Sequence, residues 1–284
     1  MTARSRRGAG ARVRTVLSYA VLILFALVFL YPFVIQTATA FKTEPDAAAH
    51  PLSPIPDPFT AEAFAHVFGG TGFPLWVANS LLVTVLVTAG RVFLDSLAGY
   101  ALARLRFRGR GAVTAMVLAV MAVPGVVLLI PKFLVLNSLG IYDTYSALVL
   151  PLIVDAAGVF IMRQFFLSVP PSLEEAARMD GAGVFRTYWS VILPMARPAL
   201  ITLTILSFQS SWNEFPHTVV AVQNPNLYTL PRGIANLVAG SLGAGTQYPL
   251  KLAAALLATI PVAIIFIVFQ RYFVRGAAEG ASKE

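Results

Sequence analysis

The sequence contains no cysteine and unusually few charged residues. Charged side chains make up 12% of its 284 residues, about half the ~25% found in soluble domains. The absence of cysteine excludes disulfides, thiolate catalysis and cysteine-ligated zinc. The histidines, at His50, His66 and His217, are too scattered in sequence to indicate a metal site. Hydrophobic residues make up 57% and the mean hydropathy is +0.76, which predicts a membrane protein with several spans.

The sequence also lacks the motifs of nucleotide-binding and hydrolytic enzymes. It contains no G-x-x-x-x-G-K-S/T phosphate-binding loop, so it does not hold a nucleotide in that way. No Ser/His/Asp set is evident, and acids within the apolar stretches are few, whereas an enzyme needs titratable groups gathered in one pocket. We therefore predict no catalytic residue, no metal and no cofactor bound by this chain.

Apolar stretches of about 20 residues predict transmembrane helices. We expect an all-α integral membrane protein with one transmembrane domain, residues 1–284, and six spans. The spans are expected at about residues 16–35, 75–101, 111–136, 145–167, 195–222 and 248–273. A cleaved signal peptide is the alternative for the first span, because Ala38-Thr39-Ala40 resembles a cleavage site. A signal core has only ~7–15 apolar residues, which favours a retained anchor. Pro124 and Pro131 predict kinks in the third span.

The distribution of basic residues predicts the orientation of the chain. The basic residues cluster in four regions of the chain. These are an N-terminal arm (Arg4, Arg6, Arg7, Arg12 and Arg14), a second loop (Arg104 to Arg110), a central region (Arg163 to Arg197) and the tail (Arg271, Arg275 and Lys283). The alternate loops hold only Lys42, Lys132, Arg232 and Lys251. The positive-inside rule then places both termini in the cytoplasm. The proline-rich segment Phe41–Pro74, with a short helix expected at Thr60–Phe68, and the loop Asn224–Gln247 face outside.

The longest polar and amphipathic run is Pro170–Pro198, which the orientation places in the cytoplasm. The sequence predicts a short helix over Leu173–Met179, with Ser172 as its N-cap and two glutamates in its first turn. Gly181 and Gly183 allow a positive backbone φ or a close approach.

A second short helix is expected over Val184–Leu193. It carries Phe185, Trp189 and Leu193 on one face. Such a helix pair suits a groove on another protein, and it equally suits an amphipathic hairpin that rests on lipid.

The same stretch resembles the EAA loop of ABC importer permeases. The matching residues are Glu175-Ala176-Ala177, Gly181 after three further residues, and Val191-Ile192-Leu193-Pro194 after nine more. Val191 departs from the pattern, which prefers isoleucine. Shorter pieces elsewhere are similar to maltose-transporter-type carbohydrate permeases; these are Asn79-Ser80, Ser96 to Ala101, Trp212-Asn213-Glu214-Phe215, Gln270 to Phe273 and, more loosely, Gly280 to Lys283.

This resemblance implies a permease subunit in a bacterial cytoplasmic membrane that imports a sugar or sugar derivative. It further implies a second homologous permease, an ABC ATPase dimer that uses ATP and Mg²⁺, and an external solute-binding protein. The implied coupling loop covers residues 170–194. Its coupling residues are Glu175, Ala176, Ala177, Asp180, Gly181, Leu193 and Pro194.

Polar groups inside spans are candidates for a solute pathway. They are Asp155, Gln209 and Asn213, and the alternative is hydrogen bonding between helices. Trp212 suits either stacking on a sugar ring or an interfacial aromatic belt. Arg91 and Asp95 lie four residues apart and are expected to form a structural pair.

Two other functional classes stay open at this point. An ATPase-independent secondary transporter or channel needs no structured docking loop. A membrane enzyme needs convergent titratable groups at one membrane face. The Asn224–Gln247 loop is the expected contact for a delivering protein. Lipid headgroups and topology account for the basic loop Arg104–Arg110 without nucleic acid.

Overall fold

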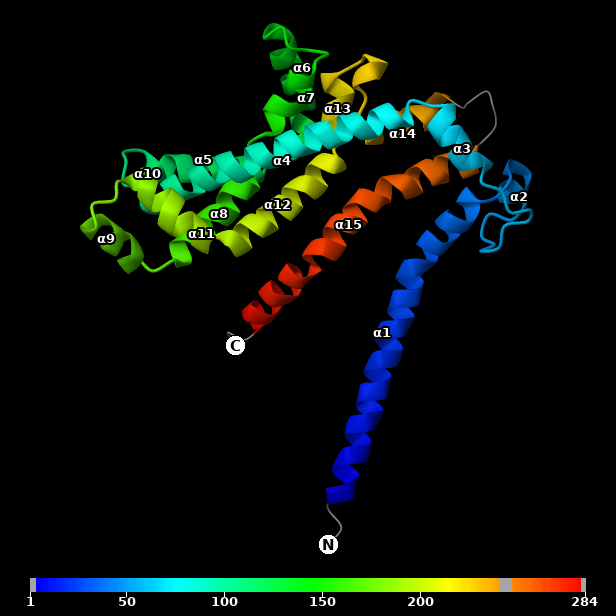
Figure 1. Cartoon of the computed structure of the whole chain (residues 1–284), viewed down its shortest axis with the longest axis horizontal. Coiled ribbons are helices and arrows are strands. Elements are labelled where there is room, and N and C mark those ends of the chain that lie inside the picture. The colour runs from blue at the N-terminus through cyan, green and yellow to red at the C-terminus, as the bar shows by residue number, and fades with distance from the viewer. Residues whose placement is uncertain (1–3, 241–246, 282–284) are drawn as a thin grey trace. The chain divides into compact units, whose positions relative to one another are not determined.

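A computed structural model of the chain describes residues 4–240 and 247–281, and within that part every regular element is a helix (Figure 1). The chain divides into two compact units. The first combines Met1–Thr71 with Leu237–Leu257, and the second combines Gly72–Asn236 with Ala258–Glu284. The side chains of the predicted basic arm before Arg14 and of the basic tail after Gln270 lie outside the described residues.

The first unit holds α1 (Arg4–Ala40), α2 (Glu44–Ala49) and α3 (Glu62–Gly69). The part of α1 from Arg14 to Ala40 is long and apolar enough to cross a membrane, as predicted. The short helix expected near Thr60–Phe68 is confirmed as α3. The first half of the proline-rich segment Phe41–Pro74 was predicted to be a loop, but it contains α2. Pro45 is compatible with this helix because it occupies the first turn, where a missing N–H breaks no helical bond.

A buried carboxylate holds the segment after α1 together. Asp46 Oδ2 accepts the backbone N–H of Asp57 at 3.0 Å, and Asp46 Oδ1 lies 3.1 Å from His50 Nδ1. Lys42 Nζ donates to the His50 carbonyl at 2.6 Å. The amide donated by Asp57 is the main reason that the pKa of Asp46 lies below its ordinary value.

The second unit is organised around α4 (Phe73–Arg104), which packs along α8 (Ala156–Ser168) and α12 (Arg197–Trp212). Small residues let these helices approach closely. A Cβ at Gly99 would lie 2.7 Å from Met162 Cβ and 2.9 Å from the Arg163 amide nitrogen. The α4–α8 interface therefore requires glycine at position 99.

The other elements of the described chain are shorter, apart from the last helix. They are α5 (Arg110–Met121), η1 (Gly125–Leu128), α6 (Leu129–Ser138), α7 (Tyr145–Val149), η2 (Leu150–Leu152), α9 (Ser172–Met179), α10 (Val184–Thr187), the π-helix η3 (Tyr188–Ile192), α11 (Leu193–Met195), α13 (Pro216–Ala221), η4 (Pro225–Leu227), α14 (Leu230–Gly240) and α15 (Tyr248–Ala281).

Four single helical segments and two bent pairs account for the six predicted spans. The single segments are Arg14–Ala40, Phe73–Arg104, Tyr145–Ser168 and Tyr248–Gln270. The bent pairs are Arg110–Met121 with Gly125–Ser138, at 101°, and Val184–Met195 with Arg197–Trp212, at 80°. Four to six crossings therefore fit by length and composition.

The structure differs from the predicted spans at the third and fifth. Around Pro124 the third span turns sharply, whereas Pro131 lies in the first turn of α6 and leaves that helix continuous. The fifth span ends at Trp212 rather than near Val222, and α13 begins at Pro216. The Asn224–Gln247 segment was expected to be a loop, yet it contains η4 and α14; residues 241–246 of that segment lie outside the described chain.

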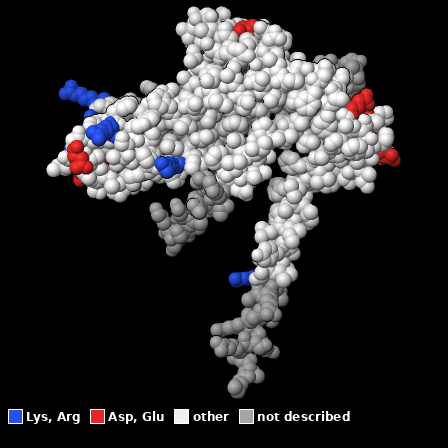
Figure 2. Space-filling model, viewed as in Figure 1, with Lys and Arg blue, Asp and Glu red and all other residues white. Residues whose placement is uncertain are grey.

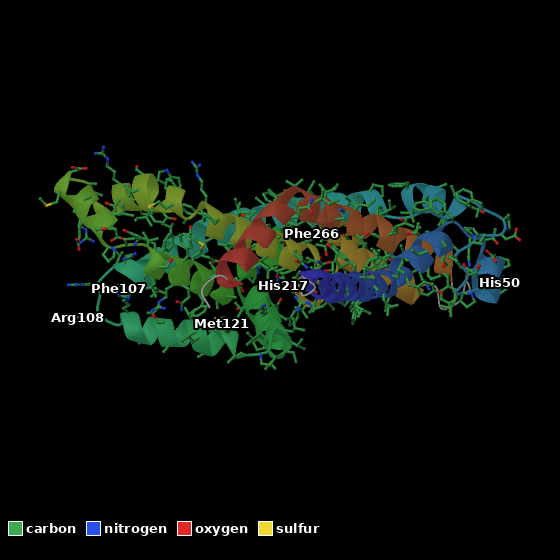
Figure 3. All side chains as sticks on the ribbon, turned by 90° about the horizontal axis from the view of Figure 1, so that it is seen from below. His50, Phe107, Arg108, Met121, His217 and Phe266 are labelled. Carbon is green, nitrogen blue, oxygen red and sulfur yellow. The ribbon has the colours of Figure 1, made fainter. Side chains whose placement is uncertain are left out.

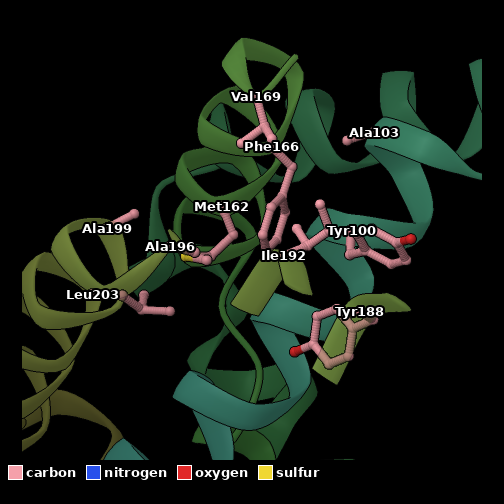
Figure 4. Close-up of a cluster of buried hydrophobic side chains, with 10 residues drawn as sticks. All are labelled: Tyr100, Ala103, Met162, Phe166, Val169, Tyr188, Ile192, Ala196, Ala199 and Leu203. Atoms are coloured by element: carbon pink, nitrogen blue, oxygen red, sulfur yellow. The ribbon is translucent and has the colours of Figure 1, made fainter. Parts of the chain in front are cut away.

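One hydrophobic cluster joins α4, α8 and the elements after α9 (Figure 4). Tyr188 and Phe166 lie at its centre and are 1% and 0% exposed. The Tyr100 ring meets the Phe166 ring edge-on at 5.6 Å and lies 5.0 Å from that of Tyr188. The cluster therefore fixes the polar stretch after α9 onto the membrane helices.

Candidate functional site

The candidate site is the coupling loop, residues 170–194, and its first part is helix α9. The helix runs from Ser172 to Met179, one residue longer than predicted. Pro171 occupies the N-cap position predicted for Ser172, and its carbonyl accepts the N–H groups of Glu174 and Glu175. Two acids in the first turn favour the positive end of the helix dipole.

Gly181 ends α9 in a left-handed conformation, with φ at +77°. The Gly181 N–H donates to the Arg178 carbonyl and the Ala182 N–H donates to the Ala177 carbonyl, both at 2.9 Å. These two bonds form a Schellman motif, which satisfies the last carbonyls of the helix. A Cβ at position 181 would meet nothing within 4 Å, so backbone conformation and not crowding selects glycine here.

The second half of the loop differs from the single helix predicted over Val184–Leu193. It is divided into α10, the π-helix η3 and α11. Gly183 has an ordinary φ of −69° and no atom near its Cβ position, so neither predicted reason for glycine applies there. The wider π turn shifts the register of the predicted apolar ridge. Phe185 and Trp189 remain 68% and 52% exposed, while Leu193 packs against the hydrophobic cluster.

Two polar contacts hold the coupling loop to α4. Tyr188 Oη and Ser96 Oγ are 2.9 Å apart and buried. Glu174 Oε1 lies 3.3 Å from Arg104 Nε, with both side chains about nine-tenths buried. Arg104 also donates to the Val169 carbonyl, just before the loop.

The two adjacent glutamates of α9 point in different directions. Glu174 is 6% exposed, and its Oε2 forms a second, longer ion pair with Arg178 at 3.7 Å. Glu175 is exposed. Sequence reasoning selected Glu175 and missed Glu174; the available signal was the spacing of Glu174 and Arg178, one helical turn apart.

The predicted coupling residues lie on both sides of the loop. Glu175, Ala176, Asp180, Gly181 and Pro194 are exposed, Leu193 is partly buried, and Ala177 is 9% exposed. Large apolar side chains accompany the exposed ones; they are Met179, Val184, Phe185 and Trp189. Figure 2 shows basic side chains, with fewer acidic ones, gathered where α9 and α10 lie, beside a largely uncharged surface. Such a surface suits a protein partner.

The predicted solute-pathway residues occupy two places. Asp155 is the N-cap of α8, accepting the Gly158 N–H at 3.1 Å, and its own N–H donates to Asp95 Oδ1. Gln209 and Asn213 are exposed together at the end of α12, where Asn213 Nδ2 donates to the Gln209 carbonyl at 2.9 Å. Their role in a pathway stays a prediction.

The contacts of Trp212, Arg91 and Asp95 differ from the predictions made for these residues. Trp212 is 2% exposed and donates to the Ala258 carbonyl at 3.1 Å, so both surface roles suggested for it are wrong. Arg91 and Asp95, which are both described, do not bind each other. Arg91 donates to the Leu152 carbonyl at 2.7 Å and Asp95 accepts from Asp155, because the facing backbone offers partners to each.

The opposite end of α4 carries a polar node whose role sequence reasoning did not identify. Asn79 Nδ2 donates to the carbonyls of Asn226 and Tyr228 at 2.8 and 3.0 Å, and its Oδ1 accepts from Tyr145 Oη at 2.7 Å. Ser80 Oγ accepts the Leu230 N–H at 2.7 Å. Asn79-Ser80 had been noticed only as part of the family resemblance. Among the described residues, no group of three or more acidic or histidine side chains is placed to hold a metal ion.

Comparison with known proteins decides the family. Residues 95–279 match the family described as binding-protein-dependent transport system inner membrane component. The chain belongs to this family. As a member, it is a multi-pass permease subunit of a binding-protein-dependent ABC transport system, and it is a transporter component and not an enzyme.

Permeases of this family match the chain along most of its length. The arabinooligosaccharide transport permease AraQ of Halalkalibacterium halodurans is 31% identical, over 91% of this chain and 92% of its own. The sn-glycerol-3-phosphate permease UgpE of Yersinia pestis is 30% identical, over 91% and 94%. The probable ABC transporter permease YurM of Bacillus subtilis is 33% identical, over 92% and 86%.

A solved permease shares the fold. A crystal structure of a bacterial ABC transporter involved in the import of the acidic polysaccharide alginate superposes with a TM-score of 0.80 at 27% identity, covering 96% of this chain and 99% of that chain. The resemblance first noticed at the EAA-like loop is therefore confirmed for the chain as a whole.

Proposed function

We propose that this permease imports a sugar or sugar derivative through an ATP-driven transporter, and that residues 170–194 dock on its ATPase. The observation that carries the docking proposal is the construction of the loop. Its inner face is fixed to the membrane helices by Tyr188 and Glu174, while its outer face presents Met179 and Phe185. A hairpin that merely rested on lipid would not need a buried ion pair at its base.

The proposed partners follow from the division of labour in such a transporter. The chain has no phosphate-binding loop, so ATP and Mg²⁺ would be used by a separate ABC ATPase dimer. A second homologous permease would complete the pathway, and an external binding protein would deliver the solute. Permeases named for oligosaccharides and for a glycerol phosphate support a polyhydroxylated cargo.

The proposed orientation places the coupling loop and both termini in the cytoplasm of a bacterial cell, with the chain in the cytoplasmic membrane. Basic residues of the loop and of the turn between α4 and α5 support it, because such residues remain on the cytoplasmic side. Figure 3 shows Phe107 and Arg108 at that turn. The proline-rich segment around α2 and the η4–α14 segment would then face outside.

The proposed solute pathway includes the exposed polar end of α12. Gln209 and Asn213 are exposed at the end of α12, which together with the segment Val184–Met195 is long and apolar enough to cross a membrane. Exposed amides at that depth are costly in lipid, so a partner permease or a hydrated pathway would cover them. Asp155 is the weaker candidate, since its side chain caps α8.

Purification from the native membrane under mild conditions tests the proposal. An ATPase and a second permease should accompany the chain. The ATPase activity of that complex should rise when the binding protein and its sugar are added. A functional assembly of this chain alone, transporting without ATP, would sink the proposal in favour of a secondary transporter or channel.

Glu175→Lys supplies a second arm of the same test. The exposed carboxylate becomes a cation while the buried Glu174 contact is untouched, so the fold is retained. ATPase copurification should fall. Glu62→Lys, the same exchange at an exposed glutamate of α3, is the matched control and should retain the ATPase. Equal retention in the two variants would count against docking at α9.

A further inference from the structure

We propose that Arg104 and Ser96 are positioning residues that fasten the coupling loop to α4, so that movement of the ATPase is passed to α4. The inference rests on the proposed function, because it assumes that the loop docks on an ATPase. It concerns a different face of the loop from the one that would touch the ATPase. The two fastenings lie on the face turned toward the membrane helices.

Arg104 holds both sides of the joint where α8 leads into α9. Its Nε lies 3.3 Å from Glu174 Oε1, and its guanidinium donates to the Val169 carbonyl. Pro170 and Pro171 lie between these two contacts, and neither has an N–H to fix the joint by backbone bonding. Across this joint, the side chain of Arg104 therefore supplies a charge-assisted hydrogen bond to the Val169 carbonyl and a buried ion pair with Glu174.

The second fastening holds the other half of the loop. Ser96 lies two helical turns before Arg104, and its Oγ is 2.9 Å from Tyr188 Oη in the π-helix η3. Tyr188 is also the centre of the hydrophobic cluster that includes Phe166. One contact therefore lies on each side of the Gly181 bend, so both halves of the loop are tied to α4.

The N-terminal end of α4 is also fixed to the rest of the second unit. The helix is continuous over 32 residues, or about 48 Å. Near its start, Asn79 and Ser80 bind the backbone at Asn226 and Leu230. The same rigid helix therefore grips the coupling loop at one end and the η4–α14 segment at the other, so that a displacement at one end reaches the other without a flexible joint.

The adjacent glutamates of α9 separate this role from docking. Glu175 is exposed and available to a partner, whereas Glu174 is buried against Arg104. Removing Glu175 should change ATPase binding. Removing the Glu174–Arg104 contact should leave binding in place and change the amount of transport obtained for each ATP hydrolysed.

The test uses the whole transporter, with its ATPase and binding protein, reconstituted in vesicles. Uptake and ATP hydrolysis are measured together for Arg104→Gln, Glu174→Gln and Ser96→Ala. Arg108→Gln is the matched control, because Arg108 is an exposed arginine close to Arg104 beyond the end of α4. Arg104→Lys keeps the charge, and the exchange Arg104→Glu with Glu174→Arg restores an ion pair.

We expect the ATPase to remain bound in all variants. Transport per ATP should fall at least fivefold in Arg104→Gln and Glu174→Gln, the lower end of common coupling strengths of about 5- to 150-fold. It should fall less in Ser96→Ala. Arg104→Lys should recover most of it, and the charge exchange, which restores the ion pair but not the hydrogen bond to the Val169 carbonyl, should recover part of it. Arg108→Gln should match the wild type.

A normal transport-to-ATP ratio in Arg104→Gln and Glu174→Gln, with the ATPase bound, would overturn the inference and leave ATPase docking intact. A ratio in the charge exchange no higher than in Arg104→Gln, with melting temperatures at the wild-type value, would overturn it as well. Absence of an ATPase from the wild-type complex would instead refute the proposed function.

Discussion

Replacing Gly181 tests whether the bend of the coupling loop matters for transport. Gly181 has a φ of +77°, and a Cβ there would touch no other atom within 4 Å. Alanine at this position therefore brings no steric clash and changes only the backbone preference. Gly183 lies two residues away, with a φ of −69° and an equally open Cβ position, which makes Gly183→Ala the matched control.

The magnitude follows from the left-handed conformation. An ordinary L-residue held there costs roughly 1–2 kcal/mol, which corresponds to about a 5- to 30-fold change in the population of the bent loop. Asparagine tolerates this conformation better than alanine does. We expect the order of uptake to be wild type and Gly183→Ala first, then Gly181→Asn, then Gly181→Ala.

The assay measures sugar uptake and ATP hydrolysis in vesicles that contain the complete transporter. Gly181→Asp is a further variant, because it adds a negative charge beside Asp180 on the exposed face of the loop, and it should uncouple hydrolysis from uptake most strongly. Equal uptake by Gly181→Ala and Gly183→Ala, with Gly181→Asp also unchanged, would refute the reasoning that the Schellman bend positions the loop.

Three further predictions concern the stability of the fold. Asn79→Ala removes three hydrogen bonds and leaves the buried Tyr228 carbonyl without this partner, so it should lower the free energy of unfolding by about 1–3 kcal/mol, seen as a lower melting temperature in detergent; an unchanged melt would show that the node is dispensable. Gly99→Ala should lower it by about 1–3 kcal/mol through overpacking against α8, whereas Gly111→Ala, with open space around it, should not. Asp46 has a lowered pKa, so it stabilises its segment above the ordinary value of 3.8, and that contribution is lost as the pH falls through the lowered pKa. Asp46→Asn should therefore speed external proteolysis of the proline-rich segment at neutral pH, while the wild type stays protected down to about pH 4; equal cleavage would contradict this.

Much of the fold follows from patterns that are visible in the sequence. Long apolar runs have few alternatives to helix in a membrane, and α1, α4 and α15 begin within a few residues of the predicted spans or include them. The breaks were harder to place. Pro124 lies in the break between α5 and η1, whereas Pro131 and Pro45 lie in the first turn of a helix. The effect of a proline therefore depends on its position relative to the start of a helix.

Some features of the candidate site could also be predicted from the sequence, and others could not. Gly181 was recognised because local backbone geometry selects glycine there and the family spacing marks it. The contacts of Glu174 with Arg104, of Tyr188 with Ser96 and of Asn79 with Asn226 were not found, because the two residues of each pair lie more than 60 residues apart in sequence. Arg91 and Asp95 show the opposite error. A spacing of four residues permits an ion pair between these two side chains. In the structure each side chain instead binds a backbone group of the segment that leads into α8, the Leu152 carbonyl or the Asp155 N–H.

Cross-linking from a single engineered thiol tests the central claim most directly, because the chain contains no cysteine of its own. Met179→Cys places a thiol on the coupling loop, at a side chain that is 88% exposed. Leu139→Cys, at a position 65% exposed between α6 and α7, places one in the loop between the third and fourth predicted spans, which the proposed orientation with six spans puts outside. In the purified transporter, a short thiol-directed cross-linker should join the ATPase to the chain through Met179→Cys and not through Leu139→Cys. No ATPase adduct at Met179→Cys, or equal adducts at both positions, would contradict docking by the coupling loop.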